Sequence, residues 1–306
     1  MHRSSRRALL ALAAVLAGGA AVVGGTMLDL GPASEAAPAP SDGTLASAEA
    51  LERLHRLPPV TDRVFAWTDV HYRGAEAQRR YAIDCMARQG FHYAPPATPA
   101  AGPGKDEDQR PRPFGLESAP SAAPPTRAPR GETPPKPGSP EASPAYAKAL
   151  FGDESKRVTA VGAKGMKVSR PGDGCLADAE KRVLGDGRMR WLQVRIMLFE
   201  AQEQARKDVE QDPAFRNATG RWRQCMERAG FPGQRDPLGL PRTPSGDMVK
   251  ADLRCKSETG YLTTAYTRLA AVQQRWLDAN PAVVKDWTAL LARQDKTSRE
   301  VLAGKT

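Results

Sequence analysis

The most regular hydrophobic pattern of the chain lies in its C-terminal half. Residues 188–209 carry a wide apolar stripe at three- and four-residue steps, which predicts a core helix. Beyond residue 260, apolar side chains recur every seven residues, as they do on a packed helix face. Asn280-Pro281 interrupts this run, so we predict two helices that keep one face. The seven-residue series consists of Leu262, Leu269, Trp276, Val283 and Leu290.

Shorter patterns precede this half. Residues 45–54 repeat apolar side chains at three-residue steps, and Pro58-Pro59 ends the run, which predicts a short amphipathic helix. Residues 74–89 are predicted to form another helix. Residues 60–73 alternate only in part, so we predict that they pack against the helices without assigning their secondary structure.

One stretch favours β-structure. Residues 158–161 and 166–169 flank Gly162-Ala163-Lys164-Gly165, which predicts a small β-hairpin. The turn superficially resembles a phosphate-binding loop, but it lacks the Walker spacing and the following Ser or Thr. Asp173 stands just before Cys175 and is expected to cap the helix that carries this cysteine. Taken together, the patterns predict a mainly α fold, a helical bundle with one small β-hairpin.

One short phrase occurs twice. Residues 85–91 and 225–231 both read Cys-Met-x-Arg-x-Gly-Phe, and each copy follows a predicted helix. A left-handed glycine just past the helix end would bring Met and Phe together in a Schellman closure. Each cysteine then lies one turn inside its helix. We infer an internal duplication.

The chain divides into segments of contrasting composition. Its middle is rich in Pro, Ala and Ser and has few bulky apolar side chains, which predicts a long disordered insert. The predicted organisation is a signal peptide or N-terminal membrane anchor at 1–30, a flexible spacer at 31–44, a first helical segment at 45–93, the Pro-rich insert at 94–144, and a second helical segment at 145–306 that packs with the first.

The N-terminus has the features of a targeting signal. Three arginines precede an uncharged stretch over residues 8–28, which is typical of an exported chain. Glycines dilute the apolar run and small residues follow it, so we favour cleavage over retention as a single membrane anchor. Arg6-Arg7 also resembles part of a twin-arginine export signal. We expect an extracytoplasmic protein, secreted or anchored to the outer face of the cytoplasmic membrane.

The formal net charge of +10 adds a preference for polyanions. An alternative is that exposed helices simply carry much arginine. Trp222 lies between Arg221 and Arg223, as aromatic side chains do in some nucleic-acid binders. However, Trp222 shares a helical face with Cys225, so we expect it in the core and expect no nucleic-acid partner. An envelope protein or an anionic wall polymer remains the expected partner.

The cysteine count is four, as expected for disulfides in an exported chain. We favour Cys85 with Cys175 and Cys225 with Cys255. In each half, a motif copy leads through a Pro-rich connection into a helix with one cysteine. The rival arrangement joins Cys85 to Cys225 and Cys175 to Cys255. The chain offers no close pair of cysteines and no nearby histidine, so we expect no metal site.

Five short motifs of the chain form a recognisable set. They are Tyr146-x-x-Ala149-Leu150-x-Gly152, Gly174-Cys175-x-x-x-Ala179, Asp212-Pro213, Trp222-x-x-Cys225-Met226-x-x-x-Gly230-Phe231 and Asp252-x-x-Cys255. Together they resemble the uncharacterised exported four-cysteine helical proteins and lipoproteins of actinobacteria. The resemblance covers residues 74–295 without the insert, and it implies a shared fold but no activity, cofactor or partner. This chain has no cysteine at the end of its signal, so lipid attachment does not carry over.

No pattern points to catalysis. The sequence has no Gly-x-Ser-x-Gly motif, and His55, His71 and His92 are flanked by Arg or Tyr and are expected at the surface. We therefore predict no catalytic, cofactor-binding or metal-binding residues. The expected function is a non-enzymatic interaction or structural module of the cell envelope. The alternatives are a cell-wall hydrolase with an unrecognised site and a binder of anionic wall polymer.

Overall fold

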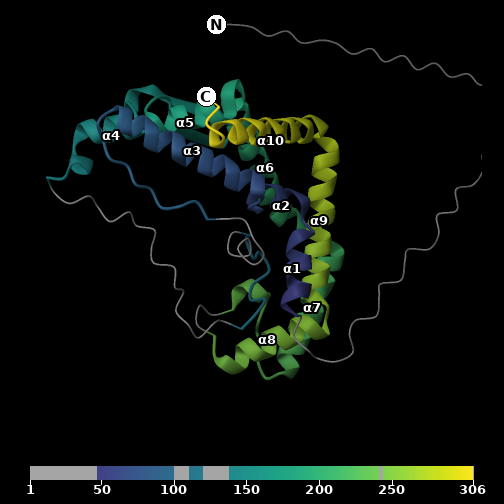
Figure 1. Cartoon of the computed structure of the whole chain (residues 1–306). Coiled ribbons are helices and arrows are strands. Elements are labelled where there is room, and N and C mark those ends of the chain that lie inside the picture. The colour runs from purple at the N-terminus through teal and green to yellow at the C-terminus, as the bar shows by residue number, and fades with distance from the viewer. Residues whose placement is uncertain (1–46, 100–109, 120–137, 241–243, 306) are drawn as a thin grey trace, which may run out of the picture. The chain divides into compact units, whose positions relative to one another are not determined.

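The computed structural model describes residues 47–99, 110–119, 138–240 and 244–305 (Figure 1). The predicted targeting segment and spacer lie outside these ranges. The described part is mainly helical, with one two-stranded sheet, as predicted. None of its helices is long and apolar enough to cross a membrane.

The elements follow the predicted order. The helices are α1 (Ala48–Arg56), α2 (Pro59–Phe65), α3 (Asp69–Arg88), α4 (Pro144–Phe151), α5 (Cys175–Leu184), α6 (Arg188–Val209), α7 (Pro213–Arg228), α8 (Gly246–Glu258), α9 (Tyr261–Ala279) and α10 (Pro281–Leu302). The strands are β1 (Arg157–Val161) and β2 (Lys167–Pro171).

The two copies of the repeated motif end their helices in the same way. The Phe91 amide donates to the Met86 carbonyl at 2.9 Å, and the Phe231 amide donates to the Met226 carbonyl at 2.9 Å. The intervening glycines have φ of 81° and 90°. This is the Schellman geometry predicted from the sequence. The duplication is therefore visible in how α3 and α7 end.

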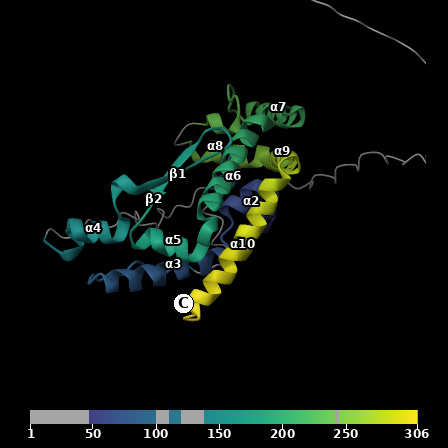
Figure 2. The ribbon, with the colours of Figure 1, turned by 90° about the horizontal axis from the view of Figure 1, so that it is seen from above.

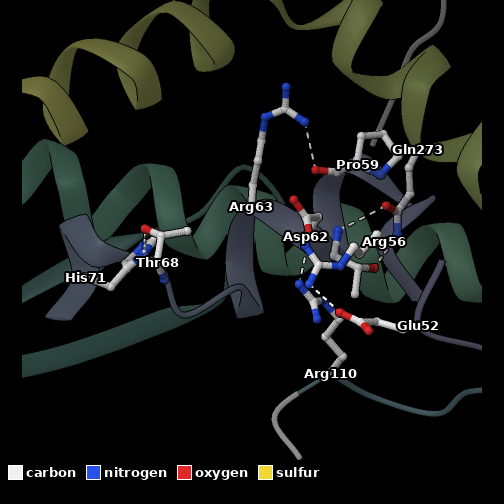
Figure 3. A network of polar contacts seen from close by, with 10 residues as sticks. Glu52, Arg56, Pro59, Asp62, Arg63, Thr68, His71, Arg110 and Gln273 are labelled. Atoms are coloured by element: carbon white, nitrogen blue, oxygen red, sulfur yellow. Dashed lines mark hydrogen bonds and ion pairs between the residues drawn. The ribbon is translucent and has the colours of Figure 1, made fainter. Parts of the chain in front are cut away.

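Residues 60–65 and 69–73 are helical, which the sequence left open, and residues 66–68 link the two helices. Pro59–Phe65 forms α2, and the predicted helix at 74–89 begins earlier, at Asp69. The N-terminus of α2 is capped from α9, because Gln273 Oε1 accepts from the Val60 amide at 2.8 Å and the Thr61 amide at 3.1 Å (Figure 3). A cap from so far along the chain has no local sequence signal, which is why this helix was missed.

The core consists of separate hydrophobic clusters, of which two involve α9. Trp222, Met226, Tyr261 and Tyr266 belong to one, and Val194, Leu198, Leu277 and Trp287 belong to another. The seven-residue series is divided between them, so it does not remain one face. Asn280 leaves the helical conformation at φ −128° and ψ 53°, and α10 turns away from α9 there (Figure 1). The last three residues of the series pack in the second cluster.

The β-hairpin lies along α6 (Figure 2). Its strands pair antiparallel, and the Gly162 amide donates to the Met166 carbonyl at 2.8 Å to close the turn. Glu200 of α6 accepts from the Lys164 amide at 3.0 Å and the Met166 amide at 2.9 Å. The hairpin prediction is confirmed, and the turn amides bind a carboxylate of the chain itself.

The expected cap of α5 is wrong. Gly174 is the N-cap residue and no side chain caps this helix. Asp173 instead accepts from the Asp153 amide at 2.8 Å and forms an ion pair with Lys156 at 3.1 Å. The backbone bends before α5, where Gly174 has φ of 86°, and Asp173 bonds to the turn that precedes β1 rather than to its own helix.

Candidate functional site

Part of the predicted disordered insert is ordered and enters the core. In the 110–119 segment, the side chain of Phe114 is only 2% exposed. Its ring contacts the rings of Tyr266 and Phe215, at centroid distances of 5.0 and 5.6 Å. In the sequence, a single phenylalanine within a Pro-rich stretch was too weak a signal to predict that this segment is ordered. The segment nevertheless helps to form the main hydrophobic cluster.

The 110–119 segment is attached to the helices at several points. At its start, Arg110 forms a 2.9 Å ion pair with Asp62 of α2 (Figure 3). Gly115 lies at a bend with φ of +83°, and a Cβ atom there would lie 2.8 Å from the Pro237 carbonyl oxygen. Glycine is needed at this position because both the backbone conformation and the space exclude a side chain.

We expect Gly115→Ala to lower the free energy of unfolding by about 1–3 kcal/mol, through backbone strain and the clash with Pro237. Urea unfolding followed by circular dichroism measures the change. Gly165→Ala is a matched control, because Gly165 has φ of +87° but its added Cβ would meet no atom within 4 Å. If both variants lost the same free energy, contact with Pro237 would contribute nothing.

Glu117 forms the centre of a buried hydrogen-bond network. Its carboxylate accepts from His55 Nε2 at 2.5 Å and from the Tyr266 hydroxyl at 2.5 Å. Burial raises the pKa of Tyr266, so the hydroxyl stays protonated and donates. The side chains of His55 and Glu117 are only 6% and 1% exposed. The expectation that His55 lies at the surface is therefore wrong, because Glu117 binds it in the core.

A second buried network adjoins the first. Lys256 of α8 donates to the Leu116 carbonyl at 2.5 Å and to Asp252 at 2.8 Å. Asp252 also accepts from the indole nitrogen of Trp222 at 2.9 Å, so Trp222 is a core residue, as predicted. Burial raises the pKa of Asp252 and lowers the pKa of Lys256. Each charge is therefore costly alone and depends on its partner.

These ionisable groups do not face a substrate-sized cavity. The hollow that His55 and Tyr266 line has a volume of only 30 Å³, room for about one water molecule. Glu117, Asp252 and Lys256 do not line it. Their arrangement can hold the 110–119 segment on α1, α8 and α9, and the side chains of all four charged partners are at most 6% exposed in the described part of the chain. We assign it a structural role.

A larger cleft of 360 Å³ is lined by Phe114 and shares Pro113 and Arg206 with the small hollow. The aromatic rings of Phe114, Phe215 and Tyr261 form its floor, with Phe215 lying 5.6 and 5.7 Å from the other two. Its walls come from the 110–119 segment, the end of α6, the outer face of α7 and the loop before α8. The polar side chains around it are Arg206, Glu210, Arg216, Thr219, Arg223 and Asp236.

Of these cleft residues, the sequence analysis considered only the arginines, as in the polyanion-binding pattern around Arg223, and it gave Phe114, Phe215 and Tyr261 no role. Gly220 was the available signal, because glycine in the middle of a predicted helix is unfavourable and calls for a reason. A second hollow, of 430 Å³, lies over one of the disulfides. Its acidic groups are already bonded within the chain, Asp173 to the Asp153 amide and Asp178 to Lys181. We therefore take the aromatic-floored cleft as the candidate binding site.

The predicted site residues are the four cysteines, and they pair as favoured. Cys85 is bonded to Cys175 and Cys225 to Cys255, with Cα atoms 5.6 Å apart in both. The first bridge joins α3 to α5 and the second joins α7 to α8. Two disulfides indicate an oxidising, extracytoplasmic environment. In the described ranges, no group of three or more His, Cys, Asp or Glu side chains is placed to hold a metal ion.

Comparison with known proteins adds no assignment. No family model, no curated protein and no solved structure matches this chain. The resemblance to actinobacterial exported proteins therefore stays a prediction, and the function has to be argued from the cleft, the buried networks and the disulfides.

Proposed function

We propose that the chain is an exported, non-enzymatic interaction module of the cell envelope. One observation carries this: the buried ionisable groups bond to one another and to the backbone of the 110–119 segment. His55 and Glu117, a pair of a type used in acid–base catalysis, lie in the core at 2.5 Å from each other. Catalysis needs such a pair within reach of substrate. The accessible cleft has an aromatic floor instead, which suits binding.

Export to the envelope is supported by three features. The basic and apolar N-terminal sequence is typical of targeting signals, and two disulfides favour an oxidising compartment. The resemblance to exported actinobacterial proteins supports the same location. We propose that the mature protein acts outside the cytoplasmic membrane, either secreted or retained by its N-terminal segment.

A sedimentation experiment tests this function. Purified, oxidised protein is incubated with isolated actinobacterial envelopes, which are then pelleted. We expect the protein to pellet with the envelopes while no soluble sugar or peptide fragments appear in the supernatant. The absence of products follows from the sealed position of His55 and Glu117. Mass spectrometry of the supernatant and gel analysis of the pellet measure the two results.

Two outcomes would contradict the proposal. The first is protein that stays in the supernatant. The second is the release of wall fragments that stops in Glu117→Gln, which would make the chain a hydrolase. Glu52→Gln is the matched control for that variant, because Glu52 pairs only with Arg56 on the outside of α1.

A further inference from the structure

The cleft floor is apolar, but its solvent-exposed part lies at Phe215 and Leu238, because Phe114 and Tyr261 are only 2% and 1% exposed. Phe114, Phe215 and Tyr261 contact one another in series and face the cleft from three separate elements. Leu238 lies at the edge with 54% of its surface exposed. A bulky apolar side chain bound here would cover Phe215 and Leu238, which removes their exposed apolar surface from water. The floor therefore selects for an apolar group.

Gly220 gives the cleft its depth along α7. It lies within a regular helix, and an added Cβ atom would meet no atom within 4 Å. Neither packing nor backbone conformation requires glycine here, and alanine is the better helix former. The missing side chain leaves the backbone of α7 open to the cleft. Gly220 is thus the residue whose enlargement fills the site without disturbing the core.

The rim offers positive charge. Arg223 forms no hydrogen bond or ion pair within the described part of the chain. Arg206 has only distant partners, Glu203 at 3.8 Å and Glu210 at 4.0 Å. By contrast, the Asp236 carboxylate accepts from two backbone amides at 2.9 Å and is committed to its own turn. The three arginines of the rim stand against Glu210 and Asp236, so the cleft carries a small net positive charge, and Arg223 is the arginine without a partner among the described residues.

We propose that this cleft binds an acidic peptide segment of a partner protein, with one bulky apolar side chain on the aromatic floor. The inference rests on the proposed interaction function and names the partner's chemistry. Carboxylates beside the apolar side chain complement Arg206 and Arg223. A fully hydrophilic polyanion would pair with the arginines but leave the apolar surface of Phe215 and Leu238 exposed, so the peptide is the better occupant.

The probe is the peptide acetyl-Glu-Asp-Phe-Asp-Glu-amide, titrated into the full oxidised chain while amide NMR shifts are followed. We expect shifts around Thr219, Gly220 and Arg223 that saturate. Replacing the peptide's Phe with Ala is expected to weaken binding by about tenfold. Reversing its charges with Lys should abolish it, because the rim arginines then repel the peptide.

Variants of α7 separate binding from folding. Gly220→Leu fills the cleft and is expected to weaken binding by at least about tenfold while the melting temperature does not fall. Its control is Asn217→Leu, at an exposed position of α7 outside the cleft. Arg223→Glu is expected to weaken binding by about fivefold. Its control is Arg228→Glu, which makes the same charge change away from the cleft.

Three outcomes would overturn the inference. One is no saturating shift at millimolar peptide. Another is a loss of affinity in the control variants equal to that in Gly220→Leu and Arg223→Glu. The third is tight binding of polyphosphate that Gly220→Leu leaves unchanged while the peptide does not bind, which would assign the surface to anionic polymer. Envelope sedimentation is a separate readout, so peptide binding without envelope binding would reject the proposed function but not this site.

Discussion

Replacing Lys256 with methionine will lower the free energy of unfolding by about 3–5 kcal/mol, because it leaves the Asp252 carboxylate buried without its counter-charge. Both side chains are almost completely buried, at 1% and 0% exposure. The Leu116 carbonyl also loses its donor. Chemical unfolding followed by circular dichroism measures the loss, and the 110–119 segment should become more susceptible to protease at the same time.

A double variant separates the cost of the unpaired Asp252 charge from the cost of the other contacts that Lys256 makes. Asp252→Asn with Lys256→Met removes both charges and keeps an acceptor for Trp222, so we expect a smaller loss of about 1–3 kcal/mol from the unsatisfied Leu116 carbonyl. Lys250→Met is the matched control on α8, because Lys250 is 82% exposed. The interpretation fails if the double variant is no more stable than Lys256→Met, or if Lys250→Met costs as much.

Removing either disulfide is the second large effect we expect. The bridges span sequence separations of 90 and 30 residues. On the chain-entropy model, replacing both cysteines with alanine costs about 4.6 kcal/mol for Cys85–Cys175 and about 3.7 kcal/mol for Cys225–Cys255. The first bridge also holds a small separate cluster with Tyr146 and Leu150, so its loss should loosen α4 as well.

The measurement is the unfolding free energy of each double-alanine variant against the oxidised wild type. Wild-type protein treated with reductant is the control, because it loses both covalent links without losing any side-chain volume. A difference within about 1 kcal/mol of wild type for either variant would show that its helices are held by packing alone.

Local patterns predicted much of this fold. The two Cys-Met-x-Arg-x-Gly-Phe copies fixed how α3 and α7 end, and Asp212-Pro213 marked the start of α7, where Asp212 accepts from the Ala214 and Phe215 amides. These features depend on residues that are neighbours in the chain. The hydrogen bonds that form these helix ends join residues within one or two helical turns, so the sequence alone was enough to predict them.

Features that depend on distant partners were not predictable in this way. The cap of α2 comes from Gln273, and His55 is buried because Glu117, 62 residues later, binds it. The 110–119 segment is ordered because Lys256 and Tyr266 bind it, although its composition favours disorder. In each case the structure depends on a contact with a residue far away in the chain, which the local sequence does not indicate.

The cleft shows the same limit for function. Phe114, Phe215 and Tyr261 come from three separate parts of the chain, and nothing in their spacing predicts that their rings meet. The cysteine pairing was predictable because the duplication repeats along the chain, whereas the binding surface occurs only once. Gly220 was a local sign of the binding surface, but a mid-helix glycine indicates a cleft only once the structure places it next to the three rings.

The Cys85–Cys175 bridge has a consequence for damage to the chain. The 110–119 segment lies between these two cysteines, so the bridge turns residues 85–175 into a covalent ring. A single backbone cut anywhere in that ring would leave one molecule, still joined through sulfur. A protease that cuts the chain once between Cys85 and Cys175 would therefore leave the helices and the aromatic cleft attached to one another.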